Sequence, residues 1–100
     1  MPSFFVEVYL PRSNAREARA SGDRARAAAE ELTREGAPIR YVRATFLPAD
    51  ETCFHLFEAA SAEVVEEACS RAALGRVRVV PAIEASSPLV RAPADEDAGS

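Results

Sequence analysis

The chain lacks several features on which common functions depend. Its twelve cations are all arginine, they are spread along the chain without a run, and the formal net charge is −4. A nucleic-acid binder normally carries a basic patch, so we expect no nucleic-acid partner. No apolar run approaches the ~20 residues that span a bilayer. Residues 1–10 show no basic leader either, so we expect a cytoplasmic protein without membrane contact.

Residues and motifs that carry catalysis are also scarce. The chain has one histidine, His55, and two cysteines, Cys53 and Cys69, but no glycine-rich phosphate loop, Ser-His-Asp order or CxxC pair. The cysteines fall in different predicted elements, so we expect two buried thiols and no disulfide in a reducing compartment. The sequence alone therefore names no reaction.

What is present fits one small domain. With 100 residues, of which 48% are hydrophobic, the chain can build one core. β-branched and aromatic stretches alternate with segments rich in Ala, Arg and Glu. The pattern predicts strands at 3–10, 39–47, 52–59 and 77–84, and helices from Asp23 to near Gly36 and from Ser61 to Leu74. Because Gly22 interrupts the segment before Asp23, residues 13–21 can be either a helical turn or a loop.

This βαββαβ order predicts an α+β, ferredoxin-like domain over residues 1–84. We expect a four-stranded antiparallel sheet in the order 4-1-3-2, with both helices on one face. Pro81 places the fourth strand at an edge, where a missing N–H is tolerated. Residues 85–100 contain Asp95, Glu96 and Asp97 and are predicted to form a flexible acidic tail.

Strict alternation along the strands assigns side chains to the two faces of the sheet. It places Phe4, Val6, Val8, Val42, Ala44, Phe54 and Leu56 under the helices. It places Phe5, Glu7, Tyr9, Tyr41, Arg43, Thr45, Cys53, His55 and Phe57 on the opposite, open face. That face mixes aromatic and ionisable groups, which is typical of an interface or a ligand surface. Two such faces packed together predict a homodimer of the dimeric α/β-barrel type, with a small-molecule cavity lined by Phe5, Tyr41, Thr45 and Phe57.

His55 is the candidate acid or base, because its unperturbed pKa of about 6.5 suits proton transfer near neutral pH. Glu7, on the adjacent central strand, can hold the tautomer of His55. Tyr9, Tyr41 and Arg43 can orient a phenolic or enolic substrate, and Arg43 can stabilise an oxyanion. The alternative is structural, with His55 packed in an interface and Glu7 paired with Arg43.

Cys53 and His55 lie two residues apart on one predicted face, so they can also ligate a metal. Two ligands do not complete a site, and Glu7 or a second copy of the chain must supply the others. We expect no cofactor on the catalytic interpretation, and nickel or zinc on this one.

The run PIRYVRATFLPADETCFHLFEAASAEVVEEACSRAALGRVRVVPAIE resembles a small actinomycete family of unknown function known for a nickel-binding ferredoxin-like dimer. The similarity covers Ser3 to about Glu84, and its most specific part is the Phe-X-Leu-Phe-Glu-Ala run, residues 54–59. The resemblance implies a dimeric ferredoxin-like fold and nickel binding. The family often has a histidine where this chain has Cys69, and a cysteine where it has His55.

Three functions follow as hypotheses from different classes. The first is a small-molecule-binding dimeric α/β barrel, acting as a cofactor-independent cyclase or isomerase of secondary metabolism through His55 and Glu7. The second is a nickel-binding or other metal-binding protein with His55, Cys53 and Glu7 as ligands. The third is a structural or accessory dimer without catalysis.

Overall fold

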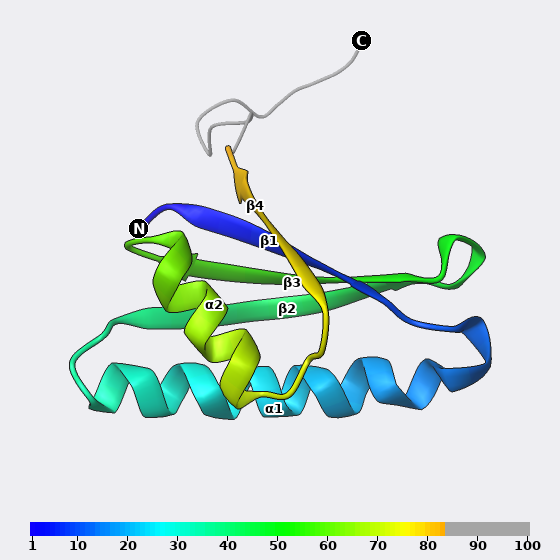
Figure 1. Ribbon diagram of the computed structural model, residues 1–100, viewed down its shortest axis with the longest axis horizontal. Coiled ribbons are helices and arrows are strands. Elements are labelled where there is room, and N and C mark those ends of the chain that lie inside the picture. Colours follow the sequence, from blue (N-terminus) through cyan, green and yellow to red (C-terminus); the bar gives the residue numbers. More distant parts are fainter. Residues whose placement is uncertain (84–100) are drawn as a thin grey trace, which may run out of the picture.

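The computed structural model describes residues 1–83 and shows a four-stranded antiparallel sheet with two helices (Figure 1). Glu84 and the predicted tail lie outside the described residues. The elements in order are β1 (Ser3–Tyr9), η1 (Arg12–Asn14), α1 (Ala15–Arg34), β2 (Ile39–Leu47), η2 (Pro48–Asp50), β3 (Thr52–Ala59), α2 (Ala62–Arg71) and β4 (Val77–Ala82). The strand order β2-β3-β1-β4 confirms the ferredoxin-like α+β fold.

β4 and β2 are the two edge strands of the sheet, and each pairs with one neighbour. β4 pairs only with β1 and carries Pro81, so the prediction of an edge strand is confirmed. β2 forms the other edge and pairs with β3 through the tight η2 turn, after which Glu51 adopts a left-handed conformation with φ of 49°.

Helix α1 is longer than the composition indicates. It begins at Ala15 and runs through Gly22, so residues 15–21 are helical and the predicted start at Asp23 is wrong. An isolated glycine weakens a helix, yet packing holds this one because Gly22 is buried against β2. A Cβ added at Gly22 would lie 3.0 Å from the Tyr41 hydroxyl oxygen, so glycine permits this close approach.

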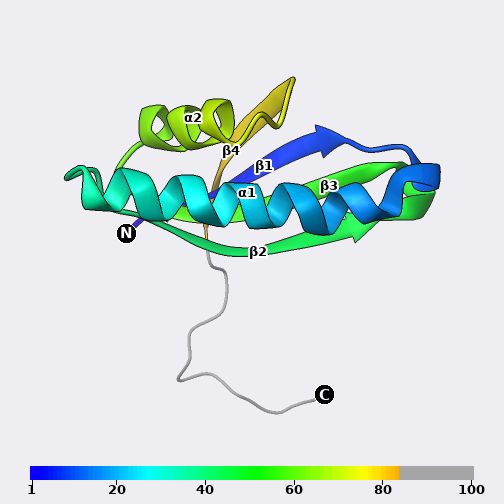
Figure 2. The ribbon, with the colours of Figure 1, turned by 90° about the horizontal axis from the view of Figure 1, so that it is seen from below.

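Both helices pack on the same face of the sheet, and the hydrophobic core lies between the helices and that face. α1 lies along β2, and α2 packs against β3 and β4 (Figures 1 and 2). Alanines form most of the buried stripe of α1, and these small side chains pack with α2 over aromatic residues of the sheet. This core includes Ala25, Ala28, Ala29 and Leu32 of α1, Val65, Ala68 and Cys69 of α2, and Phe4, Val6 and Phe57 of the sheet.

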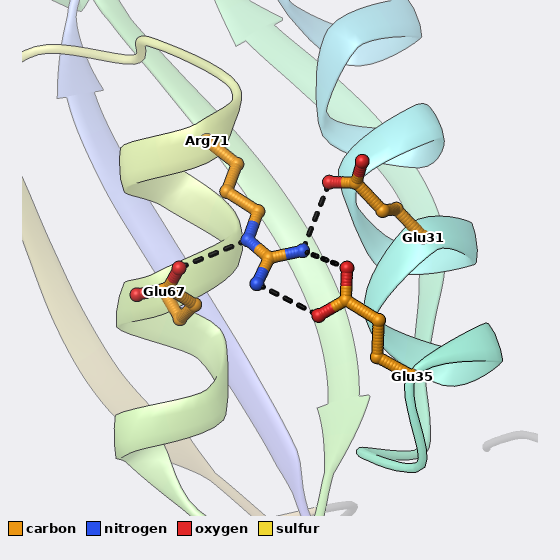
Figure 3. Close-up of polar contacts among 4 residues, drawn as sticks. All are labelled: Glu31, Glu35, Glu67 and Arg71. Carbon is orange, nitrogen blue, oxygen red and sulfur yellow. Dashed lines mark hydrogen bonds and ion pairs between the residues drawn. The ribbon is translucent and has the colours of Figure 1, made fainter.

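An arginine on α2 ties the two helices together at their outer surface. The Arg71 guanidinium donates hydrogen bonds of 2.9 Å to the carboxylates of Glu31 on α1, of Glu35 directly after α1, and of Glu67 on α2 (Figure 3). The hydrogen bond from Arg71 is the main reason that the pKa of Glu35 lies below its usual value. The contact fixes how the helices sit side by side over the sheet.

In the described part of the chain, neither helix combines the length and apolar character that a bilayer crossing requires.

Candidate functional site

The predicted acid or base, His55, lies under the helices and not on the open face. In the register of the sheet, His55 is opposite Val6 on β1 and Ala44 on β2, which both face the helices. Its exposed fraction is 0%, and the same alternation buries Cys53 and Phe57 beside it. The predicted facing of β3 is therefore wrong by one residue, and Phe54 and Leu56 point to the open face instead.

A β-bulge in β2 explains why Tyr41 is also on the helix side. Tyr41 pairs with Phe57 and Arg43 pairs with Leu56, so Val42 is an extra residue between two consecutive pairs. An extra residue reverses the alternation of everything on one side of it. Tyr41 therefore faces the helices, whereas Arg43 keeps its predicted place on the open face.

The three buried polar side chains form a short hydrogen-bonded chain. The Tyr41 hydroxyl lies 2.8 Å from His55 Nδ1, and Cys53 Sγ lies 3.8 Å from His55 Nε2. A neutral imidazole carries one N–H and one acceptor nitrogen, and hydroxyl and thiol can each donate or accept. In either tautomer both ring nitrogens thus have a partner, which is how a buried histidine is tolerated.

Burial sets the ionisation of all three groups. It lowers the pKa of His55 to about 4, with a smaller contribution from the charge of Arg24. It raises the pKa of Tyr41 to about 12 and raises that of the Cys53 thiol. At neutral pH all three groups are uncharged, and their hydrogen bonds form a structural network that joins β2 to β3 under α1.

Glu7 does not meet His55, because β1 turns it to the open face. It lies opposite Phe54 on β3 and Arg78 on β4, and its carboxylate accepts a 2.8 Å hydrogen bond from Arg78. The predicted Glu7–His55 pair is therefore wrong. The alternative pairing of Glu7 with Arg43 is not formed either, since Arg78 takes that place.

The predicted metal ligands do not converge. Cys53 and His55 are adjacent on the helix side, whereas Glu7 lies on the other face of the sheet. Among residues 1–83, no group of three or more His, Cys, Asp or Glu side chains is placed to hold a metal ion. The three predicted ligands do not form a metal site in this arrangement, and we assign no chemistry to a metal here.

The open face carries a shallow depression that sequence reasoning found only in part. Its volume is about 360 Å³, and its lining residues are Phe5, Glu7, Arg43, Thr45, Phe54 and Val80. Of the predicted ligand-binding residues, Phe5 and Thr45 line it, whereas Tyr41 and Phe57 are in the core. The predicted catalytic residues Glu7 and Arg43 line it too, and Tyr9 lies beyond it, 69% exposed.

Sequence reasoning missed Phe54 and Val80 as site residues, and it placed Phe54 under the helices, which is wrong. In β3, apolar side chains occur at both parities, and in β4 Val77, Val79 and Val80 do the same. The two phenylalanines of the depression meet edge to face, with ring centroids 6.0 Å apart and planes at 82°. The depression thus has an aromatic floor with polar groups at its sides.

Comparison with family models, with curated proteins and with solved structures finds no match for this chain. The resemblance to the nickel-binding family stays a prediction, and the function has to be argued from the open face itself.

Proposed function

We propose that this protein binds a small, largely apolar molecule in the depression on the open face of its sheet. The observation that carries the proposal is the gathering of apolar side chains on the face away from α1 and α2. Phe5 is 37% exposed there, next to Phe54 and Val80, in a hollow of about 360 Å³. Apolar surface with a few polar groups is what small-molecule sites use.

The size and lining of the depression restrict the ligand. Small-molecule sites usually measure about 300–1,000 Å³, so this one takes a molecule of one or two aromatic ring systems. The edge-to-face arrangement of Phe5 and Phe54 offers one ring face and one ring edge to a flat ligand. Proton transfer by His55 has no part in the proposal, because that side chain lies behind the sheet.

The experiment uses N-phenyl-1-naphthylamine, a neutral fluorophore with a naphthyl and a phenyl group that brightens in apolar surroundings. We expect it to bind the wild-type protein and to shift the amide signals of residues around Phe5 and Phe54 in NMR spectra. Replacing Phe54 by Thr removes most of the aromatic contact while keeping a β-former, so the affinity should fall about tenfold.

Phe46→Thr is the matched control, because Phe46 lies in the same hairpin, is also partly buried, and faces the helices. Its affinity for the probe should stay within about twofold of wild type. Equal loss of binding in the two variants, or no binding to the wild-type protein, contradicts the proposal. Far-UV circular dichroism and urea unfolding check that both variants are folded.

We also propose that a second copy of the chain covers the end of the open face beyond the depression. Tyr9 is 69% exposed and Leu47 is 39% exposed, and they lie on either side of Thr52 in one row of the sheet. The same face carries the ion pairs Arg40–Glu58 and Arg78–Glu7, so these groups add no excess of like charge when a copy of the patch meets it. Light scattering should give a dimer for the wild type and a monomer for Tyr9→Arg; a wild-type monomer refutes the pairing.

A further inference from the structure

On the open face of the described residues, Arg43 is the arginine without an ion-pair partner. Among residues 1–83, Glu7 pairs with Arg78 at 2.8 Å and Glu58 pairs with Arg40 at 2.9 Å, whereas Arg43 has no acidic partner within 4.0 Å. Within the described residues, the strands of this face carry three arginines and two glutamates, which leaves one positive charge at Arg43. An exposed cation beside an apolar hollow attracts a ligand of the opposite charge.

The register of the sheet places this charge at one side of the aromatic floor. Arg43 is opposite Leu56, which is in turn opposite Phe5, and Thr45 follows on the same face of β2. Glu7 lies on β1, on the far side of β3 from Arg43. The anionic end of a ligand should therefore lie near β2, where the Arg43 guanidinium and the Thr45 hydroxyl can both donate hydrogen bonds. Near β1 the carboxylate of Glu7 would repel it.

We infer that the ligand is an aromatic or similarly apolar monoanion, whose carboxylate, sulfonate or phosphate ester group is bound by Arg43. The inference rests on the proposed function and adds the charge and orientation of the molecule. A planar guanidinium binds such oxyanions through two parallel N–H donors, which fixes the direction of the ligand as well as its affinity. Because Arg43 is a single unpaired cation, it favours a ligand with one negative charge over a ligand with two.

The test compares two fluorophores that differ by one charged group. 8-Anilinonaphthalene-1-sulfonate is the monoanionic counterpart of N-phenyl-1-naphthylamine, so the pair isolates the contribution of the sulfonate. In Arg43→Gln, we expect the affinity for the anionic probe to fall about tenfold and that for the neutral probe to stay within about twofold. Arg43→Lys keeps the charge and should recover part of the loss.

Arg40→Gln is the matched control, because Arg40 lies on the same strand and face but is already paired with Glu58. It should leave both affinities within about twofold of wild type. If Arg43→Gln binds the anionic probe as well as wild type does, or if Arg40→Gln loses as much, the inference is wrong.

The outcome also separates this inference from the proposed function. Binding of the neutral probe at Phe54 together with indifference to Arg43 overturns the anionic ligand and keeps the apolar site. Absence of binding by both probes overturns the two together. The thermal melting curve of each variant shows whether a loss of binding reflects unfolding, and Arg43→Glu gives a second, independent reversal of the charge.

Discussion

Replacing Gly22 by alanine tests whether the buried network controls how closely α1 approaches the sheet. In a helix interior this change normally stabilises a protein by about 1 kcal/mol, because alanine is the better helix former. Here the new Cβ would lie 3.0 Å from the Tyr41 hydroxyl oxygen, closer than a comfortable contact. Tyr41 can withdraw only by stretching its 2.8 Å hydrogen bond to His55 and pressing on Phe57, whose ring centroid is 5.1 Å away.

The magnitude follows from these two opposing effects. Overpacking a tight site costs about 1–3 kcal/mol, which exceeds the helix-propensity gain. We therefore expect Gly22→Ala to lower the free energy of unfolding by about 1 kcal/mol. In the Tyr41→Phe background the nearest remaining atoms are Ala44 Cβ at 3.7 Å and the ring carbon Cζ at 3.9 Å, which are ordinary contacts. There the same change should stabilise by about 1 kcal/mol.

The assay is urea unfolding of the four proteins of this double-mutant cycle, followed by far-UV circular dichroism. The expected coupling between the two positions is about 2 kcal/mol, well above the error of such cycles. Ala27→Gly, at an exposed position of α1, calibrates the propensity difference in this helix. Equal effects of Gly22→Ala in both backgrounds, or a gain of stability in the presence of Tyr41, refutes the reasoning.

Three further predictions concern other buried or paired groups. His55 has a pKa of about 4 when folded and about 6.5 when unfolded, so the unfolded chain binds more protons between those values. The free energy of unfolding should thus fall by about 2–3 kcal/mol as the pH drops from 6.5 to about 4.5. Urea titrations of His55→Gln should lack this fall in the free energy of unfolding. If wild type and His55→Gln lose the same free energy of unfolding over this pH range, the prediction is wrong. Arg71→Gln should lower the melting temperature more than Arg34→Gln does, because it leaves three carboxylates facing one another, and salt of about 1 M should reduce the difference. Burial raises the pKa of the Cys53 and Cys69 thiols, so both should react with iodoacetamide only through unfolding, and fast labelling of native protein counts against this.

The elements and their order were predictable because each depends on local signals. The alanine stripe of α1, the turn at Pro48 and the proline of β4 each specify an element without reference to the rest of the chain. The extension of α1 before Gly22 was not predictable, because the reason for that glycine is Tyr41, which lies 19 positions away in sequence on another element.

The facing of β2 and β3 could not be read from the sequence for a related reason. Nothing in the run around Val42 indicates a bulge, and strict alternation then puts Tyr41 and Arg43 on one face. In β3, a titratable histidine beside large apolar residues favours the opposite facing to the one observed. The observed facing of β3 is the opposite one because His55 has a hydrogen-bond partner there. The Tyr41 hydroxyl reaches the His55 imidazole only if both residues face α1.

The bulge at Val42 also has an evolutionary consequence. Deleting Val42 would restore unbroken alternation and keep Tyr41 on the helix side and Arg43 on the open face, because their partners Phe57 and Leu56 are consecutive residues of β3. Homologous chains should therefore tolerate the loss of the extra residue. The tyrosine, the histidine that it contacts and the glycine that faces them from α1 should be inherited together, whatever the length of this strand.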